Sequence, residues 1–190
     1  MITIRPATLA DTKDIVDLEM TIIDQMELAM VQKIGRANVQ QVLYESALAD
    51  DQAHYSYTHA LIAELGGATV GMVVGYPATA EPTLDVTTQR LLAERFGELQ
   101  LMFPETETLP GEWYLDTLSV SEKARGKGCG TALLEAAAKL AKAQGYAVIG
   151  LNVDDANPKA RALYDKLGFQ PVKKMMFGSH QYTHMQRCLE

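Results

Sequence analysis

The stretch Arg125-Gly126-Lys127-Gly128-Cys129-Gly130-Thr131 decides the fold of this chain, because it lies between a strand-like run and an alanine-rich amphipathic segment. Three glycines at alternate positions let the backbone pass close to a ligand and take φ values that a side chain would forbid. A helix that begins directly after such a loop turns its free N–H groups and the positive end of its dipole toward that ligand. The glycine loop, residues 125–131, therefore predicts a binding site for a phosphate or pyrophosphate.

The bulk properties indicate one soluble domain, residues 1–190, with 47% apolar and 22% charged residues. A net charge of −7 argues against nucleic acid as a partner, since a phosphate backbone requires a basic surface. The first six residues do not resemble a signal peptide, and no run approaches the roughly 20 apolar residues of a membrane span. We therefore expect a cytoplasmic protein with no membrane partner.

The cysteines and histidines show no metal-ligand spacing, so no metal is predicted. Cys129 and Cys188 fit a reduced intracellular protein. Cys129 lies inside the glycine loop, where a nucleophile is conceivable, but a small space-filling residue suits the position better. The histidines are scattered; His184 can reach an acceptor site from the last strand, although a surface or partly buried histidine is the simpler interpretation.

The N-terminal part of the chain alternates between strand and helix patterns. The sequence predicts a strand over 1–5, a helix from about residue 11 through Ile23, a second helix over 39–49, and a hairpin of 58–64 and 69–75 around Gly66-Gly67. The run 113–120 is predicted as the fourth strand, and 130–144 as a helix that Gly145 ends.

The insert, residues 77–111, is less regular and is predicted to hold one helix with Leu92, Phe96 and Leu99 on one face. Two arginines and six acids occupy it: Arg90, Arg95, Glu81, Asp85, Glu94, Glu98, Glu105 and Glu107. A connection of this length is either a lid or specificity element or a solvated surface excursion. Its acidity leans slightly toward a cationic acceptor.

The C-terminal part predicts a strand over 147–153 and a short helix that Asn157 caps and Pro158 opens. One buried face of that helix is formed by residues at helical spacing, namely Ala160, Leu163, Tyr164 and Leu167. Final strands are expected at about 169–176 and 181–189.

Two motifs in this order resemble those of the GCN5-related N-acetyltransferases. Leu118-x-Val120 followed by Arg125-Gly126-x-Gly128-x-Gly130 is similar to the family's acetyl-CoA motif, and Asn157-Pro158-Lys159-Ala160-x-x-Leu163-Tyr164-x-x-Leu167-Gly168-Phe169 to its second motif. Together they cover about residues 113–170. A dinucleotide-binding fold would place its glycine loop after the first strand, and the NTPase phosphate-loop pattern is absent.

The resemblance implies an α/β fold with a mixed, strongly twisted sheet of about seven strands, flanked by helices and splayed after the fourth strand. It implies that acetyl-CoA is held by the following residues: Leu118, Ser119, Val120, Arg125, Gly126, Lys127, Gly128, Cys129, Gly130, Thr131, Asn157 and Tyr164. Backbone groups supply most of these contacts, so Arg125 and Lys127 are equally well read as solvated cations. One departure is Ser121-Glu122, where many relatives carry an acid followed by proline.

Transfer of an acetyl group from a thioester to an amine needs a neutral amine, oxyanion donors and a proton for the thiolate. The resemblance makes Tyr164 the candidate acid, although a core tyrosine would look the same. Asp116 is the candidate base, because strand alternation places it on the same face as Leu118 and Val120. Glu112, at the mouth of that strand, is a weaker candidate.

The sequence therefore predicts transfer of acetyl from acetyl-CoA to a primary amine by direct attack in a ternary complex. The acceptor is a small molecule or a peptide. Two alternatives stay open: a CoA-binding sensor that does not catalyse, and an acyltransferase that uses another acyl-CoA. A homodimer is possible, since the last strands can pair across a two-fold axis as well as lie inside the sheet.

Overall fold

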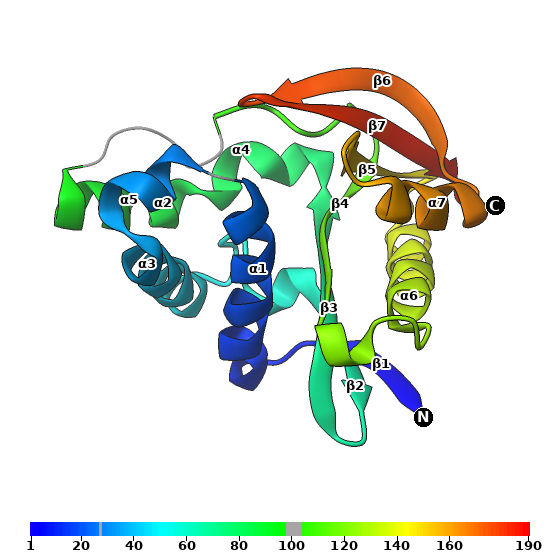
Figure 1. Ribbon diagram of the computed structural model, residues 1–190, viewed down its shortest axis with the longest axis horizontal. Helices are drawn as coiled ribbons and strands as arrows, with labels where there is room; N and C mark the ends of the chain where they lie inside the picture. The colour runs from blue at the N-terminus through cyan, green and yellow to red at the C-terminus, as the bar shows by residue number, and fades with distance from the viewer. Residues whose placement is uncertain (27, 98–103) are drawn as a thin grey trace.

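A mixed seven-stranded sheet organises the chain in the computed structural model, which describes residues 1–26, 28–97 and 104–190 (Figure 1). The strand order is β1-β2-β3-β4-β5-β7-β6, and the central β4–β5 pair is parallel while the other five pairs are antiparallel. The strands are β1 (Ile2–Pro6), β2 (Ala60–Leu65), β3 (Ala68–Pro77), β4 (Trp113–Val120), β5 (Val148–Asp154), β6 (Gln170–Phe177) and β7 (His180–Cys188). This confirms the fold class.

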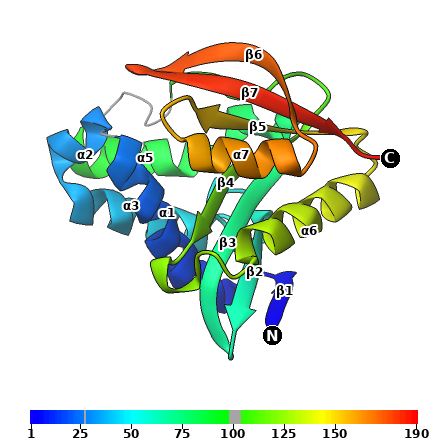
Figure 2. The same cartoon turned by 45° about the vertical axis from the view of Figure 1, so that its right-hand side comes forward.

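Helices cover both faces of the sheet (Figures 1 and 2). One face carries α1 (Thr12–Met26), α2 (Ala29–Ile34), α3 (Arg36–Ala49) and α5 (Val86–Phe96), and the other carries α6 (Cys129–Ala143) and α7 (Pro158–Lys166). Apolar residues at helical spacing, such as Ile15 and Ile23 of α1 and Leu133 of α6, are fully buried between the helices and the sheet. Two cores result, one on each face.

The predicted hairpin and first helices are present with small shifts in their ends. Gly66 and Gly67 take φ values of 63° and 80°, which only glycine adopts without strain, and they turn β2 into β3. The helix α2 was not predicted, because a six-residue segment is too short to show a periodic pattern.

The described residues of the insert hold two α-helices, whereas a single helix was predicted. A short α4 (Glu81–Leu84) precedes α5, in which Leu92 is buried and Phe96 is partly exposed. Gly97 ends α5 in the left-handed region, with φ 64°. Leu99 and Glu98 lie outside the described residues.

The sheet opens between β4 and β5. The two strands pair only from Trp113 to Leu115, opposite Ile149 to Leu151, whereas β4 continues to Val120 alongside β3. Within the described residues, no strand pairs with 116–120 on the β5 side. The sheet was expected to splay after the fourth strand. The splay is present, and it begins within β4, after Leu115.

A β-bulge at Asp116 makes one expectation wrong. Val74 pairs with Thr117 and Gly75 pairs with Leu115, so Asp116 is an extra residue in β4. A bulge shifts the alternation of side chains by one residue. The side chain of Asp116 consequently contacts Tyr76 and lies on the α1 face of the sheet, opposite to Leu118, which packs in the core under α6.

Candidate active site

The glycine loop forms a backbone cradle at the start of α6. Gly126 and Gly128 have φ values of 74° and 87°, and Gly128 is the residue before the first turn. Ala132 donates the first intrahelical hydrogen bond, to the Gly128 carbonyl at 3.0 Å, so the N–H groups of Gly130 and Thr131 have no acceptor within the helix. A Cβ on Gly126 or Gly128 would meet no described atom within 4 Å. This open, donor-rich surface fits a pyrophosphate.

The side chains near the cradle contribute less than its backbone. Arg125 donates from Nε to the Val120 carbonyl at 3.3 Å and, like Lys127, is exposed. Cys129 is 1% exposed in the first turn of α6, which agrees with a space-filling role. The Ser119 hydroxyl donates to the Leu18 carbonyl at 3.1 Å and so points toward α1, away from the sheet opening.

The second motif lies beside this cradle, with α7 close to the start of α6. Leu163 approaches to 3.6 Å from the place that a Cβ on Gly130 would take. Asn157 caps α7, as predicted, by accepting a hydrogen bond from the Ala160 N–H at 3.1 Å. The Tyr164 ring packs against Phe169 with centroids 5.9 Å apart, and burial raises its pKa to about 12. Among the described residues, none is hydrogen-bonded to its hydroxyl.

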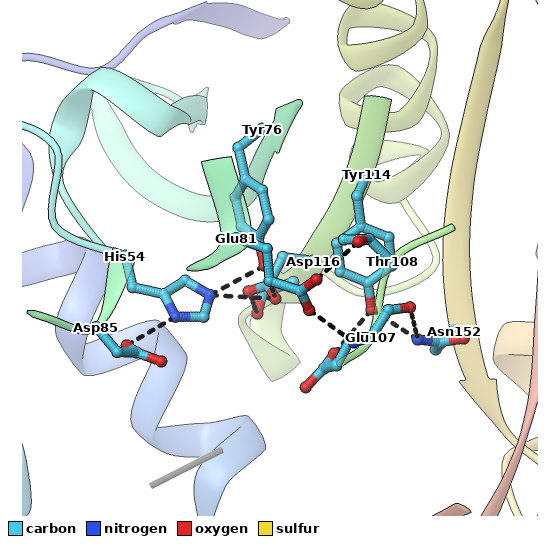
Figure 3. A network of polar contacts seen from close by, with 10 residues as sticks. His54, Tyr76, Glu81, Asp85, Glu107, Thr108, Tyr114, Asp116 and Asn152 are labelled. Carbon is cyan, nitrogen blue, oxygen red and sulfur yellow. Dashed lines mark hydrogen bonds and ion pairs between the residues drawn. The ribbon is translucent and has the colours of Figure 1, made fainter. Parts of the chain in front are cut away.

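Asp116 belongs to a buried cluster on the α1 face of the sheet, which is the face opposite to α6 and α7 (Figure 3). Its Oδ1 accepts a hydrogen bond from the Tyr76 hydroxyl at 3.0 Å and lies 3.3 Å from Nε2 of His54. Nδ1 of His54 lies 3.1 Å from Oδ1 of Asp85. The imidazole is thus held between two carboxylates.

The charges in this cluster stabilise one another. Burial opposes protonation of His54, but Asp116 and then Asp85 outweigh it and raise the pKa of this histidine well above its ordinary value. Burial alone would raise the pKa of Asp116, yet His54, Thr117 and Tyr76 hold it below its ordinary value. Asp116 is therefore ionised but weakly basic.

A second polar chain begins at Glu107, at the end of the insert (Figure 3). Its Oε2 accepts a hydrogen bond from the Tyr114 hydroxyl at 2.8 Å, and that hydroxyl accepts one from Nδ2 of Asn152 at 2.9 Å. Asn152 continues the chain through its Oδ1, which is 2.8 Å from Nδ1 of His184. Glu81 holds the Glu107 backbone by accepting its N–H at 2.6 Å.

Glu112 and His184 are buried, so the sequence-based expectations for both were wrong. Oε2 of Glu112 lies 3.0 Å from Nε2 of His184 and accepts from Nε2 of Gln186 at 2.8 Å. Glu112 is 1% exposed and His184 is 0% exposed. The carboxylate fills the space above Gly150, where a Cβ would overlap it. Glu112 therefore links the start of β4 to β7 through His184 and Gln186, and it does not lie at the mouth of the site.

Glu19 of α1 is a further buried carboxyl, only 2% exposed, near Asp116. Its Oε2 makes no hydrogen bond with the described residues. Burial, and then the charge of Asp116, raise its pKa from 4.5 to about 8. Between these values the folded protein keeps a proton that the unfolded chain releases, so the free energy of unfolding falls as pH rises.

We expect the Glu19→Gln variant to lose the part of this pH dependence that Glu19 contributes, while Glu107 and His54, whose pKa values are also raised, keep theirs. The melting temperature of the parent should decline between about pH 5 and pH 8, whereas the variant's should decline less and lie above the parent's at pH 8. Thermal denaturation across this range measures the effect. Asp17→Asn, a partly exposed position on the same helix, is the control and should follow the parent. If the melting temperatures of Glu19→Gln and the parent changed with pH in parallel, this would contradict the raised pKa of Glu19.

Comparison with known proteins places this geometry in a family. A profile of the acetyltransferase (GNAT) family matches residues 26–169, which include the glycine loop and the whole second motif. The chain belongs to the GNAT acetyltransferase family. This GNAT protein is 39% identical to an acetyltransferase of known crystal structure, with a TM-score of 0.86, coverage of 99% of this chain and 100% of that chain. It is 26% identical to an N-acetyltransferase from Staphylococcus aureus Mu50, with a TM-score of 0.87 and coverage of 97% and 100%.

A curated relative matches this GNAT acetyltransferase over a shorter segment. The mycothiol acetyltransferase of Beutenbergia cavernae is 40% identical over 76 residues, which is 40% of this chain and 24% of that protein. The chain therefore spans about a quarter of that relative's length. In the described residues no helix is long and apolar enough to cross a membrane, and no three His, Cys, Asp or Glu side chains are grouped to hold a metal ion.

The structure brings together some predicted site residues and separates others. Leu118 and Val120, the glycine loop and α7 lie around the sheet opening, whereas the side chain of Asp116 lies on the α1 face. Sequence reasoning missed His54 and Tyr76, since a lone histidine and a strand tyrosine carry no spacing signal. Four of the acids that the sequence analysis named in the insert, Glu81, Asp85, Glu105 and Glu107, line a cavity together with His54 and Tyr76.

Proposed function

We propose that this acetyltransferase transfers the acetyl group of acetyl-CoA to a primary amine by direct attack in a ternary complex. The observation that carries the proposal is the sheet opening, where β4 leaves β5 after Leu115 directly beside the cradle at the start of α6. Main-chain groups of Leu118, Ser119 and Val120 that face this opening are suited to bind an extended pantetheine arm. The helix start offers N–H groups to the pyrophosphate.

The residues around the opening supply the groups that the reaction needs. The neutral amine nitrogen forms a bond to the thioester carbonyl carbon and releases a proton to solvent, while the carbon–sulfur bond breaks and its electron pair goes to sulfur. A backbone N–H near Val120 stabilises the negative charge that develops on the carbonyl oxygen. Tyr164 donates its phenolic proton to the departing thiolate, and its raised pKa keeps it protonated at every working pH.

The test is thiol release from acetyl-CoA against a panel of amines, amino acids and peptides, with product mass measured for each. Release above the no-amine background, with one acetyl group gained by the amine, supports the proposal. Binding of acetyl-CoA by calorimetry without release for any acceptor would favour a CoA-binding sensor. Faster release with longer acyl-CoA donors would favour a different acyltransferase.

A further inference from the structure

A cavity of about 410 Å³ lies beside the insert, on the α1 face of the sheet. Its titratable lining residues come from segments that are distant in the sequence: His54, Tyr76, Glu81, Asp85, Glu105 and Glu107. Four of these side chains carry carboxyl groups. The positive charge of His54 is paired with Asp85 and Asp116, and none of the described residues that line the cavity is a lysine or an arginine. The walls therefore suit a guest of positive charge.

Two residues that line the cavity lead toward the opening in the sheet. His54 and Tyr76 both contact Oδ1 of Asp116. Asp116 is the bulged residue directly after the last β4–β5 pair, at Leu115. The polar groups that line the cavity are therefore in contact with the residue at which β4 and β5 part.

Three of the carboxylates keep an oxygen available to a guest. Oδ1 of Asp85 is used by His54, Oε1 of Glu105 accepts the Gly178 N–H at 3.2 Å, and Oε2 of Glu107 is used by Tyr114. The second oxygen of each makes no hydrogen bond with the described residues. Glu81 differs, since its two oxygens hold the Glu107 N–H and the Thr108 hydroxyl.

We propose that this cavity binds the acceptor, that the acceptor is a primary amine carrying a second positive charge, and that Glu107 receives the proton of the attacking amine. The proposal rests on the acetyl transfer proposed above and names its substrate class and base. The proton moves from the ammonium nitrogen to Oε1 of Glu107, which leaves a neutral nitrogen to attack. A carboxylate at the other end of the cavity, such as Glu105, pairs with the second charge.

The surroundings of Glu107 favour this role over Asp116. Burial, and next the negative charge of Asp116, raise the pKa of Glu107 from 4.5 to about 8, close to the working pH of an efficient general base. The titratable groups that interact electrostatically with Glu107 are His54, Tyr55, Tyr76, Glu81, Tyr114, Asp116 and Tyr182. Asp116 is paired with an imidazolium and is a poorer proton acceptor.

The test compares 1,4-diaminobutane with 4-amino-1-butanol, which has the same length but one charge fewer. We expect the parent to show a kcat/KM at least about tenfold higher for the diamine, or about 1.4 kcal/mol, because only the diamine can form a second charge-assisted hydrogen bond in the cavity. Glu105→Gln should reduce this preference through KM. Glu94→Gln, the same charge change at an exposed position of α5, should keep it.

Glu107→Gln tests the base separately, and its amide oxygen can still accept the Tyr114 hydrogen bond. We expect kcat to fall about a hundredfold or more for both amines, with the rise of rate near pH 8 lost and acetyl-CoA affinity unchanged. Equal kcat/KM for the two amines in the parent, or full activity of Glu107→Gln, would overturn this inference and leave the transferase intact. If acetyl-CoA binds but no amine is acetylated, the proposed function falls, and this inference with it.

Discussion

Replacing Gly128 by valine is expected to remove measurable acetyl-CoA binding while the protein stays folded. Gly128 has a φ of 87°, and a β-branched residue is strongly disfavoured there. No described atom lies within 4 Å of the place its Cβ would take, so the new side chain would occupy the space over the cradle. We expect calorimetry to show an affinity for acetyl-CoA lower by at least about a hundredfold, or about 2.7 kcal/mol.

Gly145→Val is the matched control for this experiment. Gly145 follows the other end of α6, has a φ of 88°, and likewise has open space around it. Both variants bear the same backbone strain of about 1–3 kcal/mol, so their melting temperatures should fall by similar amounts. Acetyl-CoA affinity should fall only for Gly128→Val. Equal acetyl-CoA affinities for the two variants would show that the glycine loop is not part of the cofactor site.

Tyr164→Phe is expected to lower kcat by about a hundredfold or more, the usual contribution of a general acid. The phenyl ring keeps its packing against Phe169, and no hydrogen bond to a described residue is lost. Acetyl-CoA affinity should therefore stay within about threefold of the parent, which separates proton transfer from binding. Steady-state kinetics and calorimetry on the same preparation measure the two quantities.

The control for Tyr164→Phe is Tyr146→Phe, which removes a phenol from the edge of the same core. Its kcat should match the parent's. A normal kcat for Tyr164→Phe would return this residue to a purely structural role in α7. A loss of kcat accompanied by an equal loss of acetyl-CoA affinity would instead indicate a binding contact.

Local patterns in the sequence predicted the parts of the structure that depend on local chemistry. Glycines at Gly66-Gly67 and in the loop before α6 encode turns, and Asn157 encodes a helix cap, because each acts within a few residues. The apolar spacing of Ile15 and Leu133 likewise encodes which helix face is buried. For the same reason, local sequence patterns were enough to predict the order of strands and helices along the chain.

The candidate site was harder to predict, because its side chains meet through tertiary packing. A bulge at Asp116 depends on how β4 pairs with β3, and nothing in the local sequence marks the extra residue. His54 precedes β2 and becomes part of the site only because Asp85 and Asp116 flank it in space. Glu112 proved structural because Gly150 leaves room for its carboxylate, a contact across 38 positions of the chain.

The short β4–β5 seam has a mechanical consequence. The sheet consists of two antiparallel blocks, β1–β4 and β5–β7, joined along the strands by three residue pairs. The helix α6 packs its buried side chains against strands of both blocks, so it connects the two blocks across the short β4–β5 pairing. A ligand that binds at the first turn of α6 would stabilise the folded arrangement of both blocks, so that they unfold as one cooperative unit.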